Sequence, residues 1–171
     1  MKQSHVNIRH ATMADVETIS AFNAALARET EGRVLDGPLL RAGVESLLQD
    51  PHKGWYAVAV NPSGGDEAII IGQILITYEW SDWRNGYFWW LQSLYVDHEY
   101  RKQGVFRQLY RYVYEQAQRS PDNVCGFRLY VERDNYHAHQ AYARIGFQET
   151  VYRMHEIEFS AKDEPSPISA C

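Results

Sequence analysis

Two long apolar segments joined by a short polar turn constrain the fold most strongly. Residues 68–78 contain two runs of three branched aliphatic side chains, and residues 87–96 form a second apolar run. The polar residues 81–86 between them are typical of a tight turn, which favours an antiparallel hairpin. Residues 55–60 read as the strand before this hairpin. The sequence therefore predicts an antiparallel meander through the middle of the chain.

Helical patterns precede this meander. A short strand is expected near Val6 and Ile8, and Thr12 then has the properties of an N-cap, with Asp15 three residues later in the capping-box position. Apolar residues recur at helical spacing up to about residue 29. A second helix is expected to begin at Gly37-Pro38, because proline suits the first helical turn, and to end at Asp50-Pro51.

The pattern changes after residue 96. A helix is expected from Gly104, a strand at residues 125–131, a helix at residues 135–144 and a last strand at residues 151–159. A strand–helix–strand unit of this spacing is a right-handed crossover, so strands 87–96 and 125–131 should be parallel. We therefore expect an α/β fold with a mixed, mostly antiparallel sheet of six to seven strands and about four helices.

Chain length and local composition suggest one domain. The chain has 171 residues, which suits a single domain over residues 1–160. Residues 161–171 hold two prolines and two serines without apolar periodicity, so we expect a disordered tail. The first five residues carry no apolar signal-peptide core, and no apolar run approaches membrane-spanning length. A cytoplasmic location is expected.

The charge balance narrows the class of partner. The 17 lysines and arginines stand against 22 aspartates and glutamates, a formal net charge of −5. Proteins that bind nucleic acid or anionic membranes through phosphate contacts are usually basic. We therefore expect neither partner, and a small cationic ligand suits the charge better. The seven histidines are scattered, so no metal site is predicted.

Two segments have patterns that could carry chemistry. The first runs from an apolar strand into a loop with Arg101, Lys102 and Gly104, and then directly into a helix. Free N–H groups at a helix start can hold a phosphate, and glycine lets the backbone approach it closely. In the second segment, Asn135, Ala138 and Tyr142 share one helix face. Each pattern alone is equally compatible with an ordinary strand-to-helix turn or a capped amphipathic helix.

Together, the two segments resemble the GNAT superfamily of acyl-CoA-dependent N-acetyltransferases. The matches are Arg101-x-x-Gly104-x-Phe106, for the family's pyrophosphate loop, and Asn135-x-x-Ala138-x-x-x-Tyr142-x-x-x-Gly146-Phe147, for its C-terminal motif. The order of strands fits over roughly residues 6–159. One departure is Phe106, which stands where the family usually has glycine or alanine.

The resemblance implies that acetyl-CoA binds between two parallel strands that separate after a β-bulge. The strand resembling residues 87–96 would pair with the pantetheine arm, and an N–H near the bulge would polarise the thioester carbonyl. The residues implied are, for the arm, Leu94, Tyr95, Val96, Asn135 and Ala138, and, for the pyrophosphate, Arg101, Lys102, Gln103, Gly104, Val105, Phe106 and Arg107.

The resemblance also implies direct acyl transfer to an amine, without an acyl-enzyme. Tyr142 matches the family's general acid, which protonates the departing thiolate. Many relatives have a glutamate within the strand before the pyrophosphate loop, but this chain has Gln92 there, which cannot accept a proton. Glu79 is the first candidate for the base; Asp82, and Tyr95 with a chain of waters, are the alternatives.

Acidic and aromatic side chains near these segments suggest where the acceptor substrate binds. Glu29 and Glu31 lie in the linker that flanks the acceptor site in this family, and Trp83 and Gln92 could line the pocket. We expect a small primary amine as substrate. A protein N-terminus or lysine remains an alternative acceptor, and a non-catalytic acyl-CoA sensor remains an alternative function. Exposed aromatic residues and a long last strand suggest a homodimer.

Overall fold

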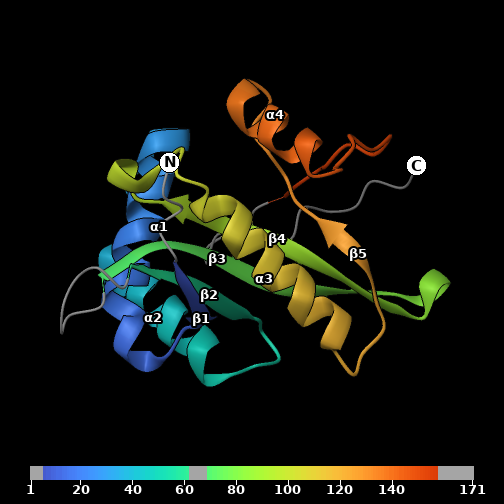
Figure 1. Ribbon diagram of the computed structural model, residues 1–171, viewed down its shortest axis with the longest axis horizontal. Helices are drawn as coiled ribbons and strands as arrows, with labels where there is room; N and C mark the ends of the chain where they lie inside the picture. Colours follow the sequence, from blue (N-terminus) through green and yellow to red (C-terminus); the bar gives the residue numbers. More distant parts are fainter. Residues whose placement is uncertain (1–5, 62–68, 158–171) are drawn as a thin grey trace, which may run out of the picture. The chain divides into compact units, whose positions relative to one another are not determined.

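The computed structural model describes residues 6–61 and 69–157. The chain divides into two compact units, Met1–Glu132 and Arg133–Cys171, which are described separately. The elements are shown in Figure 1 and comprise β1 (Asn7–His10), α1 (Val16–Glu31), α2 (Gly37–Gln49), β2 (Trp55–Asn61), β3 (Ile69–Ser81), β4 (Gly86–Val96), α3 (Val105–Arg119), β5 (Val124–Arg128) and α4 (Tyr136–Arg144), with single 3₁₀ turns η1 (Met13–Asp15), η3 (Asp82–Arg84) and η4 (His98–Tyr100).

The sheet of the first unit has the strand order β1-β2-β3-β4-β5. The pairs β1–β2, β2–β3 and β3–β4 are antiparallel, which confirms the predicted meander. The pair β4–β5 is parallel, and α3 connects its two strands across the sheet (Figure 1). The α/β class, the mixed sheet and the parallel pair are therefore as the sequence predicts.

Alternating side chains give the sheet two buried faces. Tyr56, Val58 and Val60 of β2 pack with Val16 and other apolar residues of α1 and α2. The residues between them, Ala57 and Ala59, are also fully buried, as alternation requires for a strand covered on both sides. On the second face, a Cβ added at Gly72 of β3 would touch Val105 and Leu109 of α3.

Local signals set the helix boundaries as predicted. The backbone N–H of Thr12 donates to Oδ2 of Asp15 over 2.7 Å, and α1 begins immediately after this 3₁₀ turn. The Asp36 side chain caps α2 by accepting from the backbone N–H of Leu39, with Pro38 in the first turn. Gly104 is the N-cap of α3, and Asn135 that of α4.

The C-terminal part differs from the sequence prediction. Strand β5 ends at Arg128 rather than at residue 131, because its pairing with β4 ends there. The strand predicted at residues 151–159 is wrong for residues 151–157, which are irregular. Four of these seven side chains are apolar, but the segment pairs with none of the strands that the structure describes, and Val151 is 94% exposed. The described residues therefore form five strands rather than six or seven.

Several predictions fall outside the described residues. These are the first five residues, the turn at residues 62–65, the ends of two predicted strands at residue 68 and residues 158–159, and the tail at residues 161–171. Among the residues that the structure describes, no helix has both the length and the apolar character that crossing a membrane requires.

Candidate active site

Strands β4 and β5 separate midway along β4. Their pairing runs from Tyr87–Val124 to Trp90–Arg128 and ends there, whereas β4 continues to Val96. Beyond Trp90, β4 therefore pairs with β3 on one side only. This arrangement leaves an edge along the second half of β4 onto which an extended ligand could add as a strand does.

A β-bulge lies on this separated half of β4. Gln73 of β3 pairs with Tyr95 and Leu75 pairs with Gln92, so Ile74 alone faces both Ser93 and Leu94. Ser93 has a φ of 44°, a left-handed conformation that residues other than glycine adopt infrequently. Such a bulge re-aims the main-chain groups around it, and backbone in sparsely populated conformations is common at functional sites.

The loop after β4 presents the start of α3. Lys102 and Gly104 have positive φ values of 63° and 85°, which turn the chain sharply into the helix. A Cβ built at Gly104 would meet no atom within 4 Å, so the backbone there is open to a ligand. The charged side chains of the loop, Lys102 and Arg107 among them, are exposed. The helix start, the glycine and these cations fit a pyrophosphate.

Phe106, the departure from the family pattern, packs along α3. Its ring lies 6.4 Å from that of Tyr110, one helical turn later. Gln103 donates from Nε2 to the carbonyl oxygen of Glu99 over 2.8 Å, which ties the loop to the preceding turn. Val105 is 2% exposed and anchors the first turn of α3 in the core. These three side chains therefore make contacts within the protein, and a ligand at this loop would contact mainly its main chain.

Glu29 and Glu31, expected in the linker after the first helix, lie instead in the last turn of α1, and Glu29 contacts the loop that follows β4. Its carboxylate accepts 2.7 Å and 2.8 Å hydrogen bonds from Arg101 and Tyr95, respectively. Arg101 also donates from Nε to the carbonyl oxygen of Val96 over 2.9 Å. Burial alone would raise the pKa of Glu29, but the bonds from Arg101 and Tyr95 outweigh it and lower that pKa. Burial and Glu29 raise the pKa of Tyr95.

Glu79, the first candidate for the base, lies near the end of β3. One carboxylate oxygen accepts from Nε1 of Trp90 over 2.6 Å, and the other is bonded to Arg128 at the end of β5. The guanidinium of Arg128 also stacks on the Phe88 ring, 3.8 Å from its centroid. The cluster therefore sits where the pairing of β4 and β5 ends. Arg128, a cation at the end of the parallel strand, was not among the predicted site residues.

The other residues predicted to bind the acceptor amine have no contact partner in common. Gln92 donates to Oγ1 of Thr77 over 2.6 Å and accepts from the hydroxyl of Tyr130 over 3.0 Å. Glu31 is exposed and pairs with Arg33 at 3.5 Å. Trp83 is 85% exposed at the tip of the β3–β4 hairpin, beside Asp82, whose carboxylate accepts from the backbone N–H of Trp83. Gln92 alone of these lies on the separated half of β4.

The four tryptophans of the β3–β4 hairpin, Trp80, Trp83, Trp89 and Trp90, differ in burial. Trp89 is 7% exposed and contacts the rings of Trp55, Tyr78 and Phe127, so its role is packing. Trp80 is 53% exposed and lies edge-on to the ring of Tyr87.

The second unit holds the C-terminal motif. The Asn135 side chain accepts from the backbone N–H of Ala138 over 3.1 Å and so caps α4. Gly146 has a φ of 97° and ends this helical segment, and the Phe147 ring lies 5.9 Å from that of Tyr142. Burial raises the pKa of Tyr142, so its hydroxyl keeps its proton at neutral pH.

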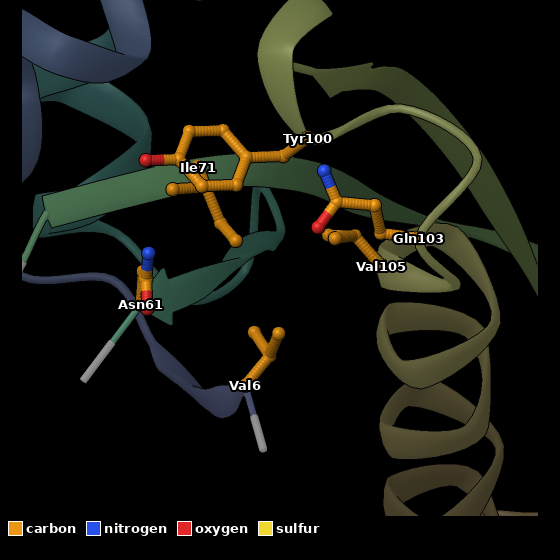
Figure 2. A pocket seen from close by; sticks show the side chains of 6 residues that line it. All are labelled: Val6, Asn61, Ile71, Tyr100, Gln103 and Val105. Atoms are coloured by element: carbon orange, nitrogen blue, oxygen red, sulfur yellow. The ribbon is translucent and has the colours of Figure 1, made fainter. Parts of the chain in front are cut away.

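A small cavity lies beside the loop in the first unit. It measures about 30 Å³ and is lined by Val6, Asn61, Ile71, Tyr100, Gln103 and Val105 (Figure 2). A cavity of this size holds little more than a water molecule. It is too small for an acceptor amine.

The separated parallel strands, the bulge and the open helix start together define an acyl-CoA-binding transferase of the GNAT fold. A family model for GNAT acetyltransferases matches residues 20–147. A crystal structure described as a possible acetyltransferase from Clostridium difficile 630 is 44% identical, covers 91% of this chain and 98% of its own, and has a TM-score of 0.81. The chain belongs to the GNAT acetyltransferase family. It is an acyltransferase and uses acetyl-CoA.

More distant structures share the fold. An aminoglycoside N-acetyltransferase in complex with CoA is 17% identical, with a TM-score of 0.69 over 91% of this chain and 95% of its own. A ribosomal-protein-alanine N-acetyltransferase from Brucella melitensis biovar Abortus 2308 is 16% identical, with a TM-score of 0.68 over 90% of this chain and 99% of its own. No curated protein matches the chain significantly.

Proposed function

We propose that the protein transfers an acetyl group from acetyl-CoA to a primary amine of a small molecule by direct attack of the amine. The observation that carries the proposal is the separation of β4 from β5 beyond Trp90, with a bulge at Ser93. Acetyl-CoA supplies an activated thioester, and the chain's residues must bind it, polarise its carbonyl and manage two protons.

Binding falls to main-chain groups of β4 and of the loop that follows it. Leu94, Tyr95 and Val96 lie on the half of β4 that has no β5 partner, so they can pair with the pantetheine arm. The loop from Arg101 to Arg107 would hold the pyrophosphate, with Gly104 and the first turn of α3 as its centre. Asn135 and Ala138 would contact the arm from the second unit, as the family motif implies.

The attacking amine must first lose a proton, because an alkylammonium has a pKa of about 10. Glu79 is the proposed base. Its bonds to Trp90 and Arg128 occupy two of the roughly four acceptor positions of a carboxylate, so the remaining positions could accept a proton from the amine directly or through water.

The departing thiolate needs a proton, which we assign to Tyr142. Tyr142 is partly buried, and burial raises the pKa of its phenol, so the hydroxyl stays protonated at neutral pH and can donate when negative charge develops on sulfur. The position of Tyr142 in the motif that begins at Asn135 supports this role.

The acceptor is proposed to be a small cationic amine. Glu29 is ionised and adjoins the loop, and Glu31 adds a second negative charge on the same helix. Trp83 and Gln92 remain predicted contacts to the acceptor. The net charge of −5 also favours a cationic substrate.

Thiol release from acetyl-CoA with a panel of amines tests the proposal. We expect release of CoA to depend on a small primary amine, and an acetylated product of the corresponding mass. The panel should include polyamines, aminoglycosides, amino acids and peptides with free N-termini or lysines. Stimulation by peptides alone would point to a protein substrate, and binding of acetyl-CoA without release for any amine would support a sensor.

Two further predictions concern the oligomeric state of the protein and its location in the cell. A homodimer remains a prediction that rests on exposed aromatic residues, of which Trp80 and Trp83 at the hairpin are examples. Light scattering on the purified full chain would measure its mass. A cytoplasmic location also remains a prediction.

A further inference from the structure

We propose that Gln73 is a positioning residue, which holds the bulge of β4 so that the N–H of Leu94 points to the thioester carbonyl. The inference rests on the proposed function, because it concerns how that reaction's polarising group is held. Gln73 lies in the middle of β3, within the apolar run of residues 68–78, and was not among the predicted site residues.

The side chain of Gln73 bonds directly to the bulge. It is fully buried, and its Nε2 donates to the carbonyl oxygen of Ser93 at 3.3 Å and to Oδ1 of Asn23 at 2.7 Å. Asn23 donates in turn to the hydroxyl of Tyr56 over 3.0 Å, and a hydrogen bond links Tyr56 to the Ser93 side chain. The bonds form a closed ring of four residues that begins and ends at Ser93.

Packing alone does not account for this residue. Its neighbours in β3, including Ile71, Ile74 and Leu75, are apolar and buried, and an aliphatic side chain would suit the same position. Oε1 of Gln73 is buried without a hydrogen-bond partner among the residues that the structure describes. Burying an unmatched amide oxygen is unfavourable, so the donor bonds to Ser93 and Asn23 must be what the side chain provides.

The geometry of the peptide group links this ring to the reaction. The described chain has no cis peptide bonds, and in a planar trans peptide the C=O of one residue and the N–H of the next point in opposite directions. Because the Ser93 carbonyl is directed to Gln73, the Leu94 N–H is directed away from Gln73. Ser93 at a φ of 44° is strained, and the ring supplies the bonds that keep it there.

The test replaces the donor without changing the side-chain volume greatly. Gln73→Met removes the bond to Ser93, and Tyr56→Phe removes the far side of the ring. Val58→Ala is the matched control, because Val58 is fully buried in the same core and forms no part of the ring. For each full-length variant, thermal unfolding, the kcat of thiol release and the Kd of CoA are measured.

We expect Gln73→Met to lower kcat by about 10- to 100-fold, less than the loss of a complete oxyanion donor, with the Kd of CoA changed less than threefold. Tyr56→Phe should show a smaller loss in the same direction. Val58→Ala should lower the unfolding temperature and leave kcat within about twofold. A loss of kcat in Gln73→Met no greater than in Val58→Ala would overturn the inference.

A measurement on the resting protein separates this inference from the proposed function. In ¹⁵N-labelled protein, Gln73→Met should shift the Leu94 amide resonance and speed its hydrogen exchange, whereas Val58→Ala should not do so selectively. An unchanged Leu94 amide would contradict the inference even if the enzyme is active. Absence of transfer to every amine, with Leu94 responding as expected, would contradict the proposed function alone.

Discussion

The carboxylate of Glu29 accepts a 2.7 Å hydrogen bond from the guanidinium of Arg101, which lies 72 residues later in the chain. Arg101 opens the loop proposed to hold the pyrophosphate of acetyl-CoA, and Glu29 is one of the carboxylates proposed to attract the acceptor amine. The two substrate regions therefore share one ion pair. A diphosphate bound at this loop would compete with Glu29 for the same cation.

Replacing Glu29 with glutamine should tighten acetyl-CoA binding. The change removes a negative charge that attracts Arg101, and both side chains of the pair are 43% exposed, so solvent screens the interaction. Exposed ion pairs contribute at most about 1 kcal/mol, so we expect a two- to fivefold lower Kd by calorimetry at low salt. Glu31→Gln is the control, because Glu31 pairs with Arg33 instead. Equal or weaker binding in Glu29→Gln than in the control would contradict the competition.

Removing the hydroxyl of Tyr142 should slow transfer more than it weakens binding. Tyr142→Phe removes the proposed acid, and general acid catalysis contributes about 100-fold or more to a rate. We expect kcat to fall by about 100-fold while the Kd of CoA stays within threefold. Tyr136→Phe is the matched control, since Tyr136 lies on the same helix and is 70% exposed. Similar kcat values for the two variants would remove Tyr142 from the mechanism.

Gly104→Ala should weaken acetyl-CoA binding through backbone conformation. Gly104 has a φ of 85°, and a left-handed conformation costs an alanine about 1 kcal/mol relative to glycine. Relaxation of that strain would turn the loop's N–H groups away from the ligand. Gly43→Ala in α2 meets no atom and no such φ, so it should raise the unfolding temperature and leave binding unchanged. Full affinity in Gly104→Ala would show that the glycine is dispensable.

Asp15→Asn should destabilise the first unit in a pH-dependent way. Asp15 is 5% exposed and accepts bonds of 2.7 Å and 2.8 Å from Arg9. Burial alone would raise the pKa of Asp15, but its bonds to Arg9 and Thr12 lower it overall. The ionised carboxylate therefore stabilises the fold above its unfolded pKa of about 3.9, and this contribution is lost as pH falls through the folded pKa.

Urea unfolding at two pH values measures this contribution. We expect Asp15→Asn to lower the free energy of unfolding by about 1–2 kcal/mol at pH 7, and by clearly less at pH 3. An equal difference at both pH values would mean that the charge of Asp15 is not what stabilises the turn.

Local patterns predicted most of the fold because each element has its own signal. Thr12 with Asp15, Pro38 and Gly104 mark helix starts through capping and backbone conformation, which depend on neighbours in the sequence. The predicted strand at residues 151–157 did not form, because apolar and β-branched residues show only that a segment could become a strand. A strand also needs a partner, and the sequence does not show whether one is present.

The sequence predicted only those parts of the candidate site whose residues form a contiguous motif. The loop from Arg101 and the helix from Asn135 carry such motifs. The bulge has no sequence signal of its own, because the positive φ of Ser93 depends on distant residues, through the pairing of β4 with β3 and the hydrogen bond from Gln73. The pairs Glu29–Arg101 and Glu79–Arg128 join residues far apart in the sequence. Gln73 has a sequence signal, because it is the one polar residue in the apolar run from Ile69 to Ile76.

A crystal structure of the protein with CoA tests the central claim most directly. The account predicts the pantetheine arm beside Leu94, Tyr95 and Val96, on the half of β4 beyond Trp90, and the pyrophosphate at the main chain of Gly104 and Val105. CoA bound elsewhere, or β4 paired with β5 along its full length in the complex, would contradict it.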